Sequence, residues 1–267
     1  MEKKWFVALL MVVVMMCACW TGAVADEERK TFTSGDYQYA LLDDGTVEIA
    51  GYKGSADLLA IPAELDGKAV TSIGDCAFYL CSSLTSVSIP DSVEQIGTNP
   101  FAACFELKTI SVSPEHPYFA TIDGVLFRKA DKALISYPAS ISSSTYTIPQ
   151  GITSIGDSAF CYCDSLTSVS IPDSVTSIGD EAFYSCSSLT SVNIPDSVTS
   201  IGDYAFSFCG SLTSVSIPDS VTSIGDYAFA GCGSLTLTVP RNSYAAEYAK
   251  ANNIPYTYPD ANDWLNN

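Results

Sequence analysis

The sequence predicts a β-rich repeat solenoid, in which short strands stack turn upon turn around a shared core. First, the chain repeats every 23 residues: residues 165–180 and 211–226 are identical, and each regular copy opens with a leucine and closes with a cysteine. Second, each copy contains a proline and is too short for two helices and a turn, which excludes helical solenoids. Third, Leu166-x-x-Val169-x-Ile171 alternates apolar and polar residues, as a half-buried strand does.

The N-terminal segment has the pattern of an export signal. Lys3 and Lys4 precede an apolar run over residues 5–16, and Ala23-Val24-Ala25 supplies small residues before an acidic stretch. We expect a signal peptide over residues 1–25, cleaved after Ala25, and therefore a secreted or cell-surface protein with no transmembrane segment after cleavage. A membrane anchor is an alternative, although the run is short for a span. Lipid attachment at Cys19 is a second alternative.

Residues 26–57 are predicted to form an N-terminal β-hairpin cap. Apolar runs at 37–42 and 46–49 flank Asp43-Asp44-Gly45, and an Asp-Gly pair between such runs is a hairpin signal. A cap is needed because the end of a repeat array exposes a hydrophobic face.

The repeats occupy residues 58–239, with an embellished turn at 113–144. The first copy has extra residues around Asp66-Gly67, which we expect to form a loop, and the turn at Asn99-Pro100 should deviate locally. In the embellished turn, Asp123-Gly124 signals a second hairpin. Residues 134–138 resemble a degenerate strand followed by proline, and the regular phase resumes at residue 145.

Residues 240–267 are predicted to be a C-terminal cap followed by an acidic tail. Residues 243–252 have the apolar stripe of a short helix, with Asn242 or Ser243 as N-cap. Residues 254–258 are a candidate final strand.

Within one regular copy the columns have separate roles. Val169 and Ile171 should point inward, and Pro172 should end the strand because it lacks an N–H. Gly179 is expected to adopt a backbone conformation closed to residues with a Cβ. Phe183 rings should stack from turn to turn beside a small alanine.

The column pattern Leu-x-x-Val-x-Ile-Pro-x-x-Val-x-x-Ile-Gly-x-x-Ala-Phe-x-x-Cys resembles the BspA-like leucine-rich repeats of bacterial surface proteins. The resemblance spans residues 58–239. The embellished turn, with residues 123–127 and Tyr137-Pro138, and the cap at 243–246 are also similar to that family. The resemblance implies a curved leucine-rich-repeat solenoid, secretion or surface display, and adhesion to host proteins or other cells. It implies no shared catalytic residues.

The charge balance argues against nucleic-acid partners. Acidic residues outnumber basic ones 30 to 12, for a net charge of −18, and phosphate binding needs clustered lysine and arginine. No cofactor is expected.

The cysteines and the aspartates that recur at fixed repeat positions could bind metal ions or form disulfides, but each set also has a simpler structural interpretation. The cysteine column is expected to hold buried free thiols or some disulfides, and a metal site is not expected because no Cys-x-x-Cys spacing occurs. Two aspartate ladders are interpreted as turn residues, with Ca²⁺ binding as the alternative. They are Asp91, Asp173, Asp196, Asp219 and Asp75, Asp157, Asp180, Asp203, Asp226.

Catalysis has little support, and no catalytic residue is proposed. His116 is the only histidine and lies between two prolines, and no hydrolase, zinc or phosphate-loop motif is present.

Binding is the function that the architecture favours, because stacked strands make extended surfaces. Hydroxyls on the outward strand positions and nearby aromatic side chains are the candidates. The candidate residues are Thr167, Ser168, Ser170, Thr190, Ser191, Asn193, Thr213, Ser214, Ser216, Tyr184, Phe208 and Tyr118. The expected partner is an extracellular protein or glycan, and the embellished turn is a second candidate region. A structural spacer with no specific ligand is the alternative function.

Overall fold

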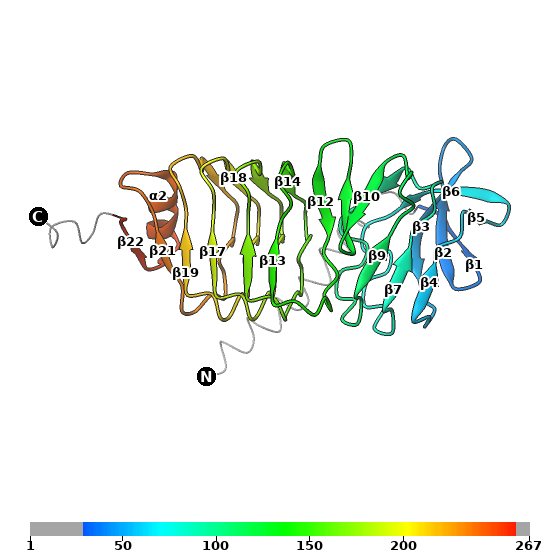
Figure 1. Ribbon diagram of the computed structural model, residues 1–267, viewed down its shortest axis with the longest axis horizontal. Coiled ribbons are helices and arrows are strands. Elements are labelled where there is room, and N and C mark those ends of the chain that lie inside the picture. Colours follow the sequence, from blue (N-terminus) through cyan, green and yellow to red (C-terminus); the bar gives the residue numbers. More distant parts are fainter. Residues whose placement is uncertain (1–28, 260–267) are drawn as a thin grey trace, which may run out of the picture.

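The protein is an elongated β-solenoid, in which successive turns of the chain stack along one axis (Figure 1). The computed structural model describes residues 29–259. The stacked turns confirm the predicted β-rich solenoid. The predicted signal peptide and the end of the acidic tail lie outside the described residues.

The first sheet contains the leucine-repeat strands. Strands one repeat apart pair in parallel, so equivalent residues such as Val169 and Val192 are neighbours. We call the outward side of this sheet the strand face. The sheet is split into a three-stranded and a six-stranded part. The first part is β4 (Leu58–Ala60), β7 (Ser86–Ser88) and β9 (Thr109–Ser111); the second is β13 (Thr145–Thr147), β15 (Ser168–Ser170), β17 (Ser191–Asn193), β19 (Ser214–Ser216), β21 (Thr236–Thr238) and β22 (Tyr256–Thr257).

A second sheet is built from the shorter strands of each repeat and is split at the same place. Its register again pairs equivalent residues, such as Ile178 with Ile201. Before the split lie β6 (Lys68–Ile73) and β8 (Gln95–Ile96). After it lie β12 (Ala133–Ser136), β14 (Ser154–Ile155), β16 (Ser177–Ile178), β18 (Ser200–Ile201) and β20 (Ser223–Ile224).

The ends of the stack are covered differently. At the N-terminal end, β1 (Thr31–Ser34), β2 (Tyr37–Leu41) and β3 (Val47–Tyr52) form an antiparallel meander, and β3 pairs in parallel with β6. The hairpin between β2 and β3 turns at the Asp-Gly signal. At the other end, α2 (Tyr244–Ala251) has Ser243 as its N-cap and buries Ala245, Ala246 and Ala249.

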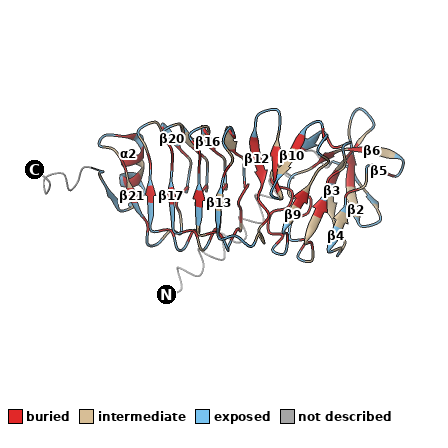
Figure 2. Ribbon diagram, in the orientation of Figure 1, coloured by how far each residue is buried: buried red, intermediate tan, exposed pale blue. Residues whose placement is uncertain are grey.

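Aromatic rings stack along the axis of the regular repeats. The centroids of Phe160, Phe183, Phe206 and Phe229 follow at 4.8, 5.0 and 5.3 Å, nearly parallel. The predicted phenylalanine ladder is therefore confirmed. The strand interiors are buried and their flanks are exposed (Figure 2).

The embellished turn divides the buried core into two clusters, one reaching Ile135 from the N-terminal side and one beginning at Val125. We call residues 58–112 the N-terminal block, 113–144 the break and 145–239 the C-terminal block. In the break, β10 (Phe119–Ile122) and β11 (Val125–Arg128) form the predicted hairpin, with Asp123 and Gly124 at φ 52° and 83°. The next strand, β12, pairs antiparallel with β11 and parallel with β14.

Three local predictions need correction. The residues around Asp66-Gly67 are not a loop: β5 (Glu64–Leu65) and β6 form a tight hairpin there, with φ of 51° and 75° at the two turn residues. Because both φ angles are positive, the turn has the backbone signature of type I′. Residues 134–138 do not supply a first-sheet strand before their proline, since β12 belongs to the second sheet.

The prediction for Gly179 was wrong in its reason. Its φ is not left-handed; a Cβ at this position would lie 2.3 Å from Oδ1 of Asp157. Glycine is required because the neighbouring turn approaches so closely. The left-handed position is two residues later, at Glu181, Tyr204 and Tyr227, where φ is 54°, 53° and 56°.

The departure at Asn99-Pro100 connects the two blocks. Asn99 is only 2% exposed. Its Nδ2 donates to the carbonyl of Ser158 at 2.7 Å, and its Oδ1 accepts from the hydroxyl of Ser136 at 2.7 Å. This side chain replaces, across the break, the backbone bonds that join regular turns.

Candidate functional site

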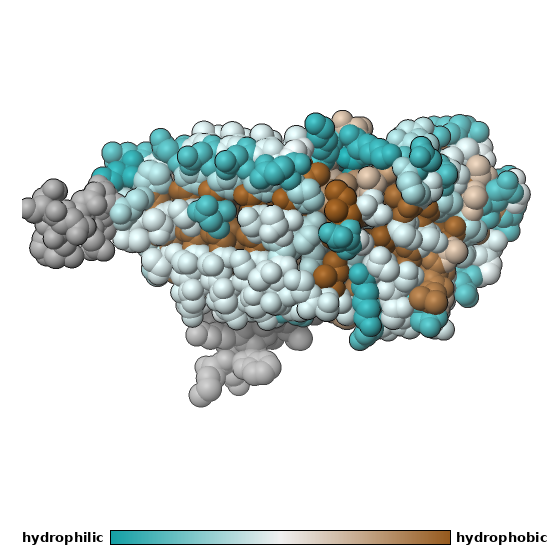
Figure 3. All heavy atoms as spheres, viewed as in Figure 1, coloured by the Kyte–Doolittle hydropathy of each residue, from teal (hydrophilic) through white to brown (hydrophobic). Residues whose placement is uncertain are grey.

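The strand face is a grid of small polar side chains. Ser168, Ser191 and Ser214 lie directly opposite one another, and the next outward row is Ser170, Asn193 and Ser216. All six are exposed, whereas the alternating valines are buried. Figure 3 shows this face as largely pale, with two hydrophobic stripes and a hydrophilic row along the edge where the strands end.

The threonine column belongs to the scaffold. Thr167 Oγ1 donates to the carbonyl of Ser144 at 3.0 Å, and Thr190 and Thr213 donate to the carbonyls of Thr167 and Thr190 at 3.1 and 3.2 Å. These hydroxyls hold neighbouring turns together. The serine and asparagine rows are therefore the hydrogen-bonding groups that remain available to a ligand.

A groove of about 420 Å³ lies where the strands end. Asn193 and Ser216 line it from the strand face, together with Ile194 and Ile217. Carboxylates from successive Pro-Asp turns make it acidic; they belong to Asp173, Asp196 and Asp219. Ile194 and Ile217 are 3% and 1% exposed, so the groove offers amide and hydroxyl hydrogen bonding and negative charge within one extended site. We call it the strand-end groove.

The predicted aromatic residues do not gather on the strand face. Tyr184 is 6% exposed, so the expectation that it offers an exposed ring is corrected, and burial raises the pKa of its hydroxyl. Phe208 is 36% exposed, but it lies with Tyr184 in the turn that follows the second sheet. Tyr118 is 40% exposed and lies in the break. The candidates thus separate into three regions.

An aromatic ladder across the break was missed at the sequence level. The ring of Phe105 contacts that of Tyr162 edge to face at 5.9 Å, and the ladder continues to Tyr184 at 5.9 Å and Phe208 at 5.4 Å. Tyr162 and Phe208 share the position before the column cysteine, but Phe105 and Tyr184 stand at other positions, so a comparison of columns detects only part of the ladder.

The second aspartate ladder has a structural role. Oδ1 of Asp157 accepts the backbone N–H of Asp180 at 2.9 Å, and the contact recurs from Asp180 to Asp203 and from Asp203 to Asp226 at 2.7 Å. Burial raises the pKa of Asp180, while its bond from the backbone of Asp203 opposes the shift. Across residues 29–259 no group of three or more histidine, cysteine or acidic side chains is placed to hold a metal ion.

The cysteine column is similarly occupied by the scaffold. The thiols of Cys186, Cys209 and Cys232 donate to the carbonyls of Phe160, Phe183 and Phe206 at 3.0 to 3.1 Å. Cys81, Cys104, Cys163, Cys186, Cys209 and Cys232, the six members of the column, form no disulfide. Burial raises the pKa of the Cys163 thiol, which disfavours the reactive thiolate.

His116 is a structural residue of the break. It is fully buried, and its Nδ1 accepts the N–H groups of Tyr118 and Phe119 at 3.2 and 3.3 Å. Nε2 must then carry the proton, and it donates to the carbonyl of Pro90 at 3.2 Å. Burial lowers the pKa of His116, which favours this neutral form.

Comparison with known proteins identifies the repeat. The profile of the BspA type leucine rich repeat region matches residues 63–133 and 136–253 in 6 copies. No curated protein matches the chain. A leucine-rich repeat protein from Eubacterium ventriosum has a similar solved structure: it is 20% identical, covers 79% of this chain and 78% of its own, and superposes with a TM-score of 0.59.

Two further solved structures are similar over most of the chain. A leucine rich cell surface protein from Faecalibacterium prausnitzii is 22% identical over 84% of this chain and 98% of its own, with a TM-score of 0.45. The leucine-rich repeat protein of T. pallidum is 27% identical over 87% of this chain and 99% of its own, with a TM-score of 0.42. Over residues 29–259, no helix is both long and apolar enough to cross a bilayer.

Proposed function

The chain belongs to the BspA-type leucine-rich repeat family, and from that premise we propose that it is a secreted or surface-displayed, non-catalytic module that binds an extracellular protein or glycan. The N-terminal signal pattern supports export. The single observation that carries the binding role is the strand face. Its serine and asparagine rows are exposed, regularly spaced and not used by the ladders that hold the turns together.

The strand-end groove supplies the rest of the site. Protein interfaces contain many hydrogen bonds, and the exposed side chains of Asn193 and Ser216 place hydrogen-bonding groups at one edge, above the buried Ile194 and Ile217. The repeated geometry favours an extended ligand that contacts several turns at once. The acidic rim favours a ligand with positive charge.

The test is a triple substitution, Ser168→Lys, Ser191→Lys and Ser214→Lys, in the mature protein. Binding to extracellular matrix proteins, mucins and whole cells is measured by surface plasmon resonance and flow cytometry. The matched control places lysine at Ser200 and Ser223 of the second sheet. We expect saturable binding by the parent and the control, and its loss in the strand-face variant. No saturable binding to any of these targets at micromolar protein contradicts the proposal.

A structural spacer is the second candidate, favoured by the identity of residues 165–180 and 211–226. A spacer needs a rigid rod of defined length and no specific face. It predicts that deleting one whole repeat alters function, whereas the lysine substitutions on either face leave function unchanged.

A further inference from the structure

A second groove, of about 410 Å³, opens at the break in the second sheet. Three segments far apart in the sequence build it: residues 75–99, 128–135 and 154–179. Its apolar lining includes Ile96, Ile135 and Ile155, and its polar lining includes Asp75, Thr98, Arg128, Asp157 and Ser177. We call it the break groove.

The groove lies against an open strand edge. In regular turns, the carbonyl of the second-sheet isoleucine accepts the N–H of the glycine in the next turn: Ile178 accepts from Gly202, and Ile201 from Gly225, each at 2.9 Å. The turn that follows Ile96 in the stack carries β12, which pairs with β11 and β14 but not with β8. Within residues 29–259, β8 pairs only with β6.

The same holds two residues earlier. Thr199 donates its N–H to the carbonyl of Thr176, and Thr153 donates to that of Lys132, but among residues 29–259 no backbone N–H bonds to the carbonyl of Glu94. The carbonyls of Glu94 and Ile96 therefore face the break without a strand. In a parallel ladder the residue that accepts from a neighbouring strand also donates to it, so the N–H of Ile96 faces the same edge.

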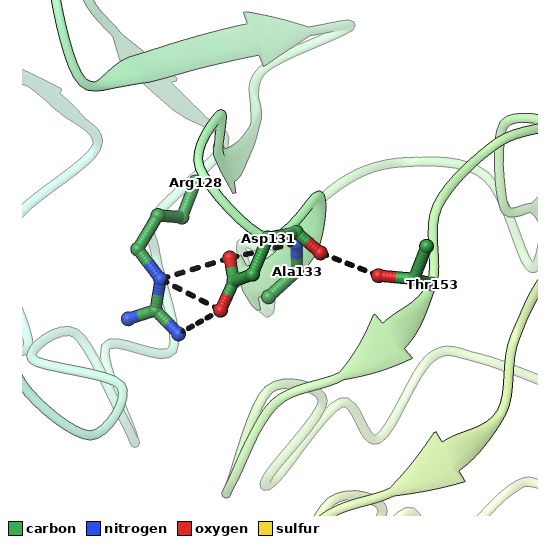
Figure 4. A network of polar contacts seen from close by, with 4 residues as sticks. All are labelled: Arg128, Asp131, Ala133 and Thr153. Carbon is green, nitrogen blue, oxygen red and sulfur yellow. Dashed lines mark hydrogen bonds and ion pairs between the residues drawn. The ribbon is translucent and has the colours of Figure 1, made fainter.

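The groove is negatively charged. Asp75 and Asp157 contribute carboxylates, and Oδ1 of Asp75 accepts the N–H of Thr98 at 2.6 Å. Arg128 balances them only in part: its Nε and Nη2 bind the carboxylate of Asp131 at 3.0 and 2.8 Å (Figure 4), and its charge also acts on Asp157. Asp131 is itself held by the N–H of Ala133 at 3.3 Å and by the hydroxyl of Thr153 on its carbonyl.

We propose that the break groove binds an extended polypeptide segment of a partner protein, added as a strand to the open edge of β8. An added strand supplies N–H and C=O groups at the two-residue spacing that Glu94 and Ile96 require. Alternate apolar side chains contact the isoleucines, and basic side chains reach Asp75 and Asp157. The chain's own ends do not fit, because Asp26-Glu27-Glu28 and Asp260 with Asp263 carry the same charge as the groove. This site is on the second sheet and does not depend on the strand face.

The probe is acetyl-Val-Lys-Val-Lys-Val-amide, titrated into the mature protein while the amide resonances of Ile96 and Asp157 are followed by NMR. Two matched peptides separate backbone pairing from charge: one has glutamate in place of lysine, and the other is N-methylated at alternate residues. We expect saturable shifts with the lysine peptide and at least tenfold weaker binding by each of the other two.

Matched variants locate the site on the protein. Ser177→Trp places a large side chain in the groove, and Ser200→Trp puts the same side chain at the equivalent position one turn away. Asp157→Asn removes a groove charge, and Asp203→Asn removes a charge from the same ladder outside it. We expect at least tenfold weaker binding for S177W, several-fold weaker binding for D157N, and less than a twofold change for the two controls.

Three outcomes of the peptide and variant titrations overturn the proposal, and a fourth concerns the protein without peptide. The first three are the absence of saturable shifts at millimolar lysine peptide, equal affinity for the N-methylated peptide, and equal effects of S177W and S200W. Ile96 shifts that depend on protein concentration without peptide also overturn it, because a second copy of the chain would then occupy the edge.

Discussion

The C-terminal block and the break connect one turn to the next through different contacts. In the C-terminal block every turn repeats the same contacts: phenylalanine rings at about 5 Å and aspartate, threonine and cysteine bonds to the adjoining turn. At the break these repeated contacts stop, and single contacts that occur once take their place: the side chains of Asn99 and His116 and the ring pair Phe105–Tyr162. Where the contacts between neighbouring turns are repeated, the loss of one leaves the others in place. Where the repeat is interrupted, the connection between turns depends on individual residues.

The largest expected effect comes from the ring stack. Phe183→Ala removes a fully buried ring between two parallel neighbours, and we expect it to lower the free energy of unfolding by about 3–5 kcal/mol. Urea unfolding followed by circular dichroism measures the loss. The control, Phe105→Ala, truncates a ring that is 44% exposed. A loss for the control as large as that for F183A contradicts the assignment of the core.

The second largest effect is expected from Asn99, whose hydrogen bonds connect the two blocks across the break. Asn99→Ala leaves the carbonyl of Ser158 and the hydroxyl of Ser136 without their partner, which should cost about 1–3 kcal/mol. Because the bond spans the two core clusters, we also expect the single unfolding transition to separate into two. Asn193→Ala, on the exposed strand face, should leave the transition unchanged. A single unshifted transition in N99A argues against its connecting role.

The pH dependence sharpens the contrast further. Burial lowers the pKa of His116, so the unfolded chain takes up a proton at a higher pH than the folded one. Stability contributed by neutral His116 is present above the ordinary histidine pKa of about 6.5 and is lost as the pH falls below it, by at most about 1.4 kcal/mol per pH unit. Thermal unfolding between pH 7.5 and 5.5 should show this slope in the parent and a smaller one in H116Q. Equal slopes in the parent and in H116Q would contradict the contribution of neutral His116 to stability.

A smaller effect is expected within the aspartate ladder. Asp203→Ala removes the acceptor of the Asp226 N–H, at 2.7 Å, for about 0.5–1.5 kcal/mol. Asp203→Asn retains an oxygen acceptor and should cost less. The comparison of the two by urea unfolding separates the hydrogen bond from the charge, and identical losses would mean that the charge alone matters.

The smallest effect belongs to the strand face. Ser191→Lys changes an exposed residue on β17, a strand that is paired on both sides. It should alter the free energy of unfolding by no more than about 0.5 kcal/mol. A larger loss would show that this row supports the fold and is not free for a ligand.

The regular architecture could be predicted from the sequence because each column recurs. Val169, Ile171 and Phe183 occur in the same chemical context in every copy, so one assignment fixes all of them. The helix at 244–251 was also predictable, since Ser243 and the alanine stripe are local signals. The Asp-Gly pair at 123–124 signalled its hairpin for the same reason.

The break was less predictable because its contacts join residues far apart in the sequence. Nothing near Asn99 indicates that it bonds to Ser158, and nothing near Ile96 indicates that β12 pairs with β11 and β14 and leaves β8 unpaired on that side. The burial of Tyr184 likewise depends on Tyr162 and Phe208 in adjacent turns. Gly179 lies close to the carboxylate of Asp157 in the neighbouring turn. The residues adjacent to Gly179 in the sequence do not indicate this contact.

Hydrogen exchange of individual backbone amides tests most directly whether the stack is interrupted at the break. The N–H of Ile96 should exchange at least ~100-fold faster than those of Ile178 and Ile201, because an unpaired edge opens to solvent without unfolding. Ile73, on the paired strand of the same block, should exchange slowly like the latter two and so controls for block stability. Equal protection of Ile96 and Ile73 would contradict the open edge and, with it, the division of the molecule proposed here.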